Sequence, residues 1–374
     1  MMDKTTTAAQ SVADTTIAGA GQLTSRERVR LALTHHEPDR VPIQDSIWDA
    51  TLDRWRDEGY PHNVPVDEYF GFELTNFGAD CSPRFPVTVL SRDAEYIVET
   101  TSYGGVRKNH RDHSTTPELL EYPIKIPADW QEIKKRLEPS YTRIDWVSAR
   151  SRYDRDRHDG KFICYSGVTG YDNCQSYIRT DELLLALLTE PEMVRDMIET
   201  QADLVIEQAK LYIKEGFIFD GAYLYNDMGY RNGPLFSPDT YRRLILESDQ
   251  RLTEFFHSHD MPVILHSCGQ VKSLIPALIE GGIDCIQPLE VKAGMDVVEL
   301  KAEFGDRMAF MGGIDQRLMS HPDRSLIEEE IHRKFEAAKP GGGYIYHSDH
   351  SVPTSVSFAQ YQEVIAIVHK YAPY

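Results

Sequence analysis

Short apolar segments alternate with amphipathic segments from about residue 155 to the end of the chain. The apolar segments have the length of buried strands, and the amphipathic segments have the 3.6-residue period of helices. Repeated strand–helix units form a parallel sheet with crossover helices. The expected strands are residues 162–166, 217–225, 263–267, 285–290, 308–312 and 344–348. The expected helices are residues 181–215, 238–259, 271–280, 297–304, 324–338 and 358–371.

The amino-terminal part of the chain brings the strand count close to eight. A helix over residues 25–34 precedes a strand over residues 41–45, and more β-rich sequence lies between residues 80 and 106. Polar residues recur at the carboxyl ends of nearly all the strands, where (β/α)8 barrels carry their chemistry. We therefore predict an α/β fold, a (β/α)8 TIM barrel, with a doubly wound sheet as the alternative.

The domain organisation follows from the same pattern. Residues 23–374 contain no repeat and no convincing linker, so we expect a single barrel domain. Pro and Arg are scattered through residues 75–123, and we expect an amino-terminal helical and β-rich insertion there, over the barrel mouth. Residues 1–22 are rich in Thr, Ala, Ser and Gly and are expected to form a disordered leader.

Composition excludes several classes of protein. The chain has 59 acidic and 40 basic residues and a formal net charge of -19, without the basic stripe that nucleic-acid binding needs. No apolar segment reaches the roughly 18 residues of a membrane span. Its 5 cysteines are scattered and odd in number, which indicates a reducing, cytoplasmic compartment where a thiol can remain a metal ligand.

His266 and Cys268 are two residues apart at the end of an expected strand. Side chains at positions i and i+2 of a strand project from the same face, so the imidazole and the thiol point together. Imidazole and thiolate form a zinc-type donor set. The alternative is an inert buried cysteine beside a hydrogen-bonded histidine, and the spacing alone does not decide between the two interpretations. A position of both residues at a barrel mouth favours the metal site.

Other strand ends supply further candidates for this site. A catalytic zinc usually has three protein ligands and one open position. We expect His350 as the third ligand, with Glu290 as a competing or additional oxygen donor; either could instead be a hydrogen-bonded loop residue. His347 and Asp349 are weaker candidates, and Asp349 could hold the second nitrogen of a liganding imidazole. The remaining strand-end residues expected to face the substrate or to be structural are Asp45, Trp48, Tyr225, Asn226 and Asp227.

These motifs resemble the uroporphyrinogen decarboxylase superfamily, and more closely its corrinoid-dependent methyltransferase branch. The resemblance extends over about residues 23–374 and includes His-Ser-Cys-Gly at residues 266–269. It implies a (β/α)8 barrel, in agreement with the alternation of strands and helices. The other matching stretches are residues 26–33, 38–42, 80–86, 226–238, 287–296, 312–315 and 348–353.

Two departures from the family pattern bear on activity. True uroporphyrinogen decarboxylases carry Arg-Gln-Ala-Gly-Arg-Tyr near the first strand, whereas residues 41–48 here read Val-Pro-Ile-Gln-Asp-Ser-Ile-Trp. Without those arginines an acidic tetrapyrrole is not expected to be the substrate. Thiol methyltransferases of the family bind zinc through His-x-Cys and a later Cys, and that later position here corresponds to His350. A neutral imidazole there leaves the ion more electrophilic, which suits a Lewis acid that polarises an oxygen.

The resemblance implies a zinc-dependent methyltransferase that moves a methyl group from a small methoxylated, aromatic donor to the cobalt of a separate corrinoid protein. Zinc on His266, Cys268 and His350 would polarise the ether oxygen. The corrinoid (cobalamin) is expected on a partner protein because Asp-x-His-x-x-Gly is absent from the sequence. The residues expected to contact the donor are Trp48, Phe85 and Tyr225 by stacking, and Asn226, Asp227 and Asp349 by polar contact.

Two alternatives remain at this stage. The first is a cofactor-free decarboxylase or lyase that acts on a smaller acid, with Asp45 or Asp227 as the catalytic proton donor. The second is a barrel without catalytic activity that binds a corrinoid or tetrapyrrole. Loss of activity with chelators would exclude the first, and turnover would exclude the second.

Overall fold

A curled parallel sheet of seven strands forms the centre of the molecule, whose computed structural model describes residues 23–111 and 116–374. The strands run in the order β1-β6-β7-β10-β11-β12-β13, and all are parallel to their neighbours. The expected leader, residues 1–22, lies outside the described residues. The strands are β1 (Leu74–Gly78), β6 (Phe162–Val168), β7 (Gly221–Tyr225), β10 (Val263–His266), β11 (Cys285–Gln287), β12 (Ala309–Met311) and β13 (Tyr344–Ile345).

The segment expected as the first strand, residues 41–45, joins the two edges of this sheet. Ile43 forms a parallel bridge with Tyr346, just after β13. On the other side, the amide of Glu73, just before β1, donates to the carbonyl of Ile43 at 3.0 Å. The segment therefore occupies the eighth position of a ring, and the predicted (β/α)8 barrel is confirmed. It makes isolated bridges rather than a regular strand.

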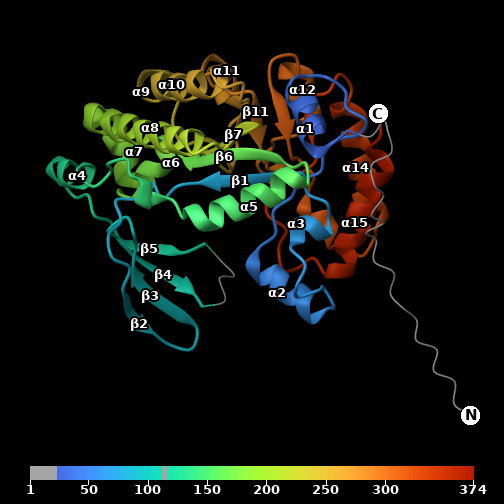
Figure 1. Cartoon of the computed structure of the whole chain (residues 1–374), viewed down its shortest axis with the longest axis horizontal. Coiled ribbons are helices and arrows are strands. Elements are labelled where there is room, and N and C mark those ends of the chain that lie inside the picture. The colour runs from blue at the N-terminus through green and yellow to red at the C-terminus, as the bar shows by residue number, and fades with distance from the viewer. Residues whose placement is uncertain (1–22, 112–115) are drawn as a thin grey trace, which may run out of the picture.

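Helices surround the barrel (Figure 1). The expected helix over residues 181–215 is two helices, because Pro191 has no amide hydrogen to continue the first and begins the second. The helix α5 was missed because nearly half of its residues are charged and only two, Tyr153 and Asp156, are buried. The longer helices are α1 (Ser25–Leu33), α2 (Asp49–Asp57), α4 (Pro127–Lys134), α5 (Trp146–His158), α7 (Thr180–Thr189), α8 (Pro191–Lys214), α10 (Leu246–His257), α12 (Val297–Phe304), α14 (Ser325–Ala338) and α15 (Phe358–Tyr371).

The remaining helices are single turns or little more, and they follow strand ends or link longer helices. They are α3 (Val66–Tyr69), α6 (Gly170–Gln175), α9 (Pro238–Leu244), α11 (Ile275–Glu280), α13 (Gln316–Met319) and the 3-10 turns η1 (Tyr141–Arg143), η2 (Lys272–Leu274) and η3 (Val291–Ala293). Two short strands, β8 (Gly229–Tyr230) and β9 (Gly233–Pro234), form a small antiparallel pair after β7. None of the described helices has the length and apolar character that a membrane span requires.

The expected insertion contains a separate antiparallel sheet (Figure 1). Its strands run in the order β2-β3-β4-β5. The predicted range, residues 75–123, was too wide, because β1 at its beginning belongs to the barrel. That strand was missed because its sequence, Leu-Thr-Asn-Phe-Gly, mixes polar with apolar residues. The four strands are β2 (Val89–Arg92), β3 (Tyr96–Thr100), β4 (Val106–His110) and β5 (Glu118–Glu121).

The amino-terminal motif over residues 26–42 has a structural role. Arg28 on α1 forms a buried ion pair with Glu73 and a partly buried ion pair with Asp39, the latter at 2.6 Å. Arg40 contacts the second oxygen of Glu73 at 2.9 Å. Breaking one member of such a buried network leaves an uncompensated charge, so the motif fixes α1 to the start of β1.

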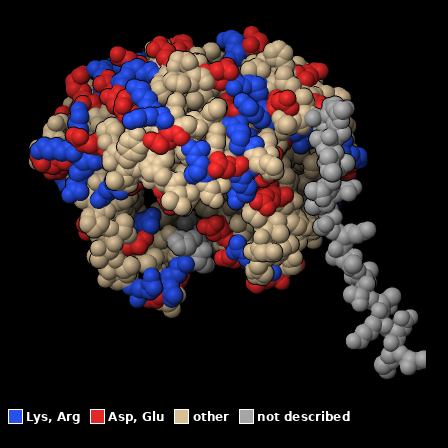
Figure 2. Space-filling model, viewed as in Figure 1, with Lys and Arg blue, Asp and Glu red and all other residues tan. Residues whose placement is uncertain are grey.

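The outer surface carries both signs of charge. On the face shown in Figure 2, acidic and basic side chains of the described residues are intermixed and do not form a continuous basic stripe.

Candidate metal centre

Three neighbouring strands end side by side at the carboxyl edge of the sheet. In the strand register Tyr225 of β7 lies beside His266 of β10, and His266 lies beside Gln287 of β11. The loops after β7 and β10 pack closely, since a Cβ added to Gly229 would lie 2.2 Å from the carbonyl oxygen of Cys268. This close approach brings the loop after β7 beside the His-Ser-Cys-Gly segment.

His266, Cys268 and Asp227 form a cluster with metal-binding character. The ligand atoms of these three side chains all lie within 4.8 Å of one another. The Sγ of Cys268 is 3.3 Å from the Nε2 of His266, and that nitrogen is 3.6 Å from the Oδ1 of Asp227. Two ligand atoms on one tetrahedral zinc lie about 3.4–3.6 Å apart, from the usual bond lengths. The three residues therefore fit a zinc ion in type and in spacing.

The neighbours of His266 leave one ring nitrogen available for a metal. Its Nδ1 is hydrogen-bonded to the amide oxygen of Gln287, so Nδ1 carries the proton and Nε2 has the free lone pair. The amide nitrogen of Gln287 donates to the Nε2 of His347 at 3.3 Å, and the Nδ1 of His347 donates to the carbonyl of Ser348 at 2.7 Å. This chain of bonds fixes the tautomer of His266 in the form that a metal requires.

The thiol of Cys268 needs a cation to ionise. Burial, followed by the nearby carboxylates of Asp227 and Glu290, raises its pKa far above the ordinary range. The backbone amide of Cys268 donates to the Oδ1 of Asp227 at 2.8 Å, which holds the carboxylate in place. A bound divalent ion would displace the thiol proton and reverse this effect. Without a cation the residue is not a free nucleophile.

The third residue of the cluster differs from the prediction. We expected His350 or Glu290 as the third ligand, whereas the structure brings Asp227 to His266 and Cys268. The Oε2 of Glu290 accepts from the amide of Gly269 at 2.8 Å, and its Oε1 pairs with Lys292 at 2.8 Å. Glu290 thus fixes the loop after β10, a structural role that nothing in its sequence position revealed.

His350 faces the same cavity without joining the cluster. Its Nδ1 accepts from the amide of Ser351 at 2.9 Å, and its ring is stacked on Trp48 with the centroids 6.2 Å apart. Desolvation by burial lowers the pKa of His350, so the imidazole is neutral at pH 7. Its role as a ligand stays a prediction.

The cluster borders a cavity of about 380 Å³ at the barrel mouth. One part of its wall is aromatic and includes Trp48 and Tyr225, whose contact with a donor stays a prediction. Tyr223, two residues before Tyr225 on the same strand face, was missed although the period of two could have identified it. The lining residues are Ser46, Trp48, Thr116, Tyr223, Tyr225, Asp227, His266, Cys268, Gln287, Pro288, His347, His350 and Ser351.

Two predicted carboxylates have structural positions. Asp45 is buried and accepts from the hydroxyl of Tyr361 at 2.7 Å and from the amide of Ser46 at 2.9 Å. Asp349 accepts from the amides of Val291 and Gln316 at 3.1 and 3.0 Å, and burial raises its pKa to about 6. Neither lines the cavity, and the catalytic role of Asp45 and the substrate contact of Asp349 stay predictions.

Two further predicted contacts also lie outside the cavity lining. Phe85 packs under the guanidinium of Arg136, whose central carbon is 4.2 Å from the ring centroid. Asn226 is fully buried, and its Oδ1 accepts from the amide of Asp172 at 3.1 Å. Neither residue lines this cavity, and their contact with a substrate stays a prediction.

Asp172 is a carboxyl group near the cluster that the sequence did not identify. It lies on α6, a six-residue helix without a periodic signal. Burial, together with the charge of Asp227, raises its pKa to about 7. Near neutral pH this group can therefore hold or release a proton close to the cluster.

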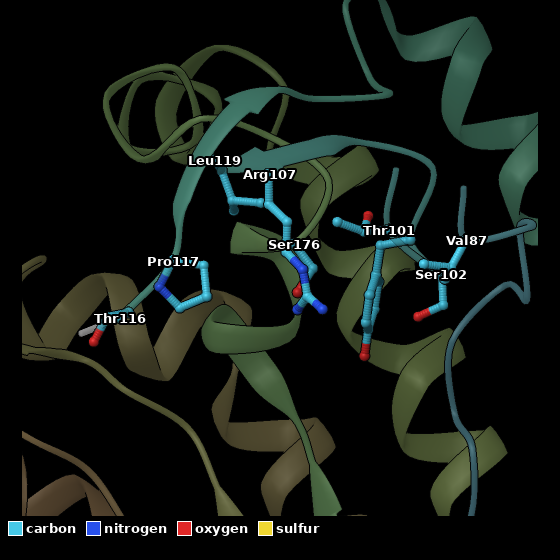
Figure 3. Close-up of a pocket in the computed structure, with 9 residues that line it drawn as sticks. Val87, Thr101, Ser102, Arg107, Thr116, Pro117, Leu119 and Ser176 are labelled. Atoms are coloured by element: carbon cyan, nitrogen blue, oxygen red, sulfur yellow. The ribbon is translucent and has the colours of Figure 1, made fainter. Parts of the chain in front are cut away.

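The small sheet contributes to the surroundings of the site. A separate cavity of about 350 Å³ lies against β4 and β5, with Arg107 and Ser176 in its wall (Figure 3). Thr116 lines both this cavity and the one beside the cluster. Arg107 is already held by Glu99 at 2.8 Å. The small sheet therefore reaches the barrel mouth, as predicted for the insertion.

Comparisons with known proteins agree with the family that the motifs predicted and with the barrel fold. Residues 105–371 match the family described as Uroporphyrinogen decarboxylase (URO-D). A methylated-thiol–coenzyme M methyltransferase of Methanosarcina mazei is 25% identical over 211 residues, which are 54% of this chain and 47% of that protein. The chain thus spans about half the length of this curated relative. A solved structure, a methyltransferase from Methanosarcina mazei, matches with a TM-score of 0.66 at 13% identity, over 94% of this chain and 99% of that one, which shows a shared fold.

Proposed function

Since the chain belongs to the uroporphyrinogen decarboxylase family, as its motifs predicted, we propose that it is a zinc-dependent methyltransferase. It would take a methyl group from a small methoxylated aromatic compound and pass it to the cobalt of a separate corrinoid protein. The observation that carries this proposal is the cluster of His266, Cys268 and Asp227 beside a cavity with an aromatic wall. The similarity to methyltransferases in sequence and in fold supports the same reaction class.

Several residues in and beside the cavity have a task in this proposal. His266, Cys268 and Asp227 would hold the ion, which when bound supplies a Lewis acid for the ether oxygen of the donor. Trp48 and Tyr225 offer flat apolar surfaces for an aromatic ring. Gln287 keeps His266 in its ligand tautomer, and Glu290 holds the loop that carries Cys268.

The ligand set also favours a second candidate. With Asp227 as the third ligand the set contains two anionic groups, as does the His-x-Cys and Cys set of thiol methyltransferases. A neutral third ligand would favour an ether as the methyl donor. That argument therefore applies only if His350, and not Asp227, is the third ligand. The Methanosarcina mazei relative is named for its activity on a methylated thiol, which also supports a sulfur compound as the methyl donor. The second candidate is therefore methyl transfer from a thioether.

A matched pair of donors distinguishes these candidates. Guaiacol and 2-(methylthio)phenol differ only in the atom that bears the methyl group. Each is incubated with zinc-loaded protein and free cob(I)alamin, and the absorbance change of the cobalt is followed. Faster reaction of guaiacol supports the ether, and faster reaction of the sulfur compound supports the second candidate. If both rates equal the rate without protein, methyl transfer from this donor class is refuted.

A further inference from the structure

A second cavity, of about 540 Å³, also borders Cys268. It lies among the loops after β7, β10, β11 and β12, and its wall contains Gly229 and Gly269 at the close crossing of two of these loops. Cys268 lines this cavity and the aromatic one. The two cavities therefore share a wall at the candidate metal centre.

The second cavity has a positive rim. Three cationic side chains line it, Arg231, Lys292 and Arg317, against the single carboxylate of Glu290. Glu290 pairs with Lys292 at 2.8 Å, and Arg317 is held at 2.7 Å by Asp315. These pairs leave an excess of positive charge, in a protein whose net charge is -19.

Arg231 is the cation best placed to recognise an anion. Within the described residues it forms no ion pair, in contrast to the other two cations. A guanidinium binds a carboxylate through two parallel hydrogen bonds, which a lysine cannot do. Its side chain is exposed, so its attraction is screened by salt and modest in size.

We propose that the methyl donor is an aromatic carboxylate. Its ring would lie in the first cavity beside Trp48 and Tyr225, and its carboxylate would lie in the second cavity near Arg231. This inference rests on the proposed function and adds the charge of the substrate to it. Apolar contact alone would accept neutral and anionic rings equally, whereas the positive rim selects the anion.

Binding of two closely related compounds tests this inference without catalysis. Vanillate and vanillyl alcohol share the methoxylated ring and differ in the carboxylate. Both are titrated calorimetrically into zinc-loaded protein at 20 mM salt. We expect vanillate to bind about fivefold more tightly, and this preference should disappear at 500 mM salt. Equal affinity for the two compounds at low salt would overturn the inference.

The variant Arg231→Gln should lose most of the preference for vanillate. The matched control is Arg307→Gln, which removes an exposed arginine at the opposite, amino-terminal end of β12. The control should keep the preference, and an unchanged preference in Arg231→Gln would refute the assignment of that residue. Methyl transfer from guaiacol without a preference for vanillate would refute only this inference. A lack of methyl transfer from every donor would refute the proposed function, while the titration would still decide the charge preference.

Discussion

Zinc binding should become tighter as pH rises, because Cys268 must lose its proton to bind the ion. Burial and two nearby carboxylates raise the pKa of this thiol far above neutral, so without metal it stays protonated throughout the range from pH 6 to pH 8. One proton is then released per ion bound, and the dissociation constant should fall about tenfold per pH unit. Over two pH units the change is about a hundredfold, or about 2.7 kcal/mol.

Competition with a chromophoric zinc chelator at several pH values measures this dependence. The slope of log Kd against pH should be about -1 or steeper for the parent protein. Cys268→Ser should bind zinc more weakly and should lose about one unit of slope. Cys81→Ser, which removes a buried thiol that is not part of the cluster, serves as the control and should keep the parental slope. A slope near zero in the parent protein would show that no thiol proton is released and would refute this account of Cys268.

Three other perturbations give distinct results. Asp227→Asn should lower zinc content more than His350→Ala, measured by mass spectrometry of purified protein, and the reverse order would make His350 the third ligand. Uroporphyrinogen should not be decarboxylated, because residues 41–48 lack the family's arginines, and the formation of coproporphyrinogen at the rate of an authentic decarboxylase would contradict this. The buried Asp249 has a pKa raised to about 7 by desolvation, above its value of 3.8 in the unfolded chain. The folded state therefore loses stability as pH rises from about 4 to about 7, by at most about 4 kcal/mol. Asp249→Asn should remove this loss, so urea unfolding should show a more stable variant at pH 8 and little difference at pH 4.

The barrel could be predicted from the sequence because its signal is local and periodic. The helices α12 and α15 have the expected bounds because their apolar residues follow the helical period without a proline. The strand β1 was missed because two of its five residues are polar. Those positions become strand only through pairing with β6, which is a long-range contact.

The candidate site was predictable where two residues are neighbours in sequence. His266 and Cys268 were identified from their spacing, since a strand places both on one face. Asp227 was given a different role because it lies on another strand, and the close crossing of Gly229 and Gly269 that brings it to Cys268 has no sequence pattern. Glu290 was expected as a metal ligand. In the structure it accepts a hydrogen bond from the amide of Gly269, and the sequence contains no signal for this contact.

The metal content of the purified protein tests the central claim most directly. The protein is prepared without added ions and analysed by mass spectrometry, beside Cys268→Ser and the control Cys81→Ser. The cluster of His266, Cys268 and Asp227 predicts about one zinc per chain in the parent and in the control, and little in Cys268→Ser. Full zinc in Cys268→Ser, or parent protein that binds no zinc even when the ion is supplied, would contradict the metal centre and the function proposed from it.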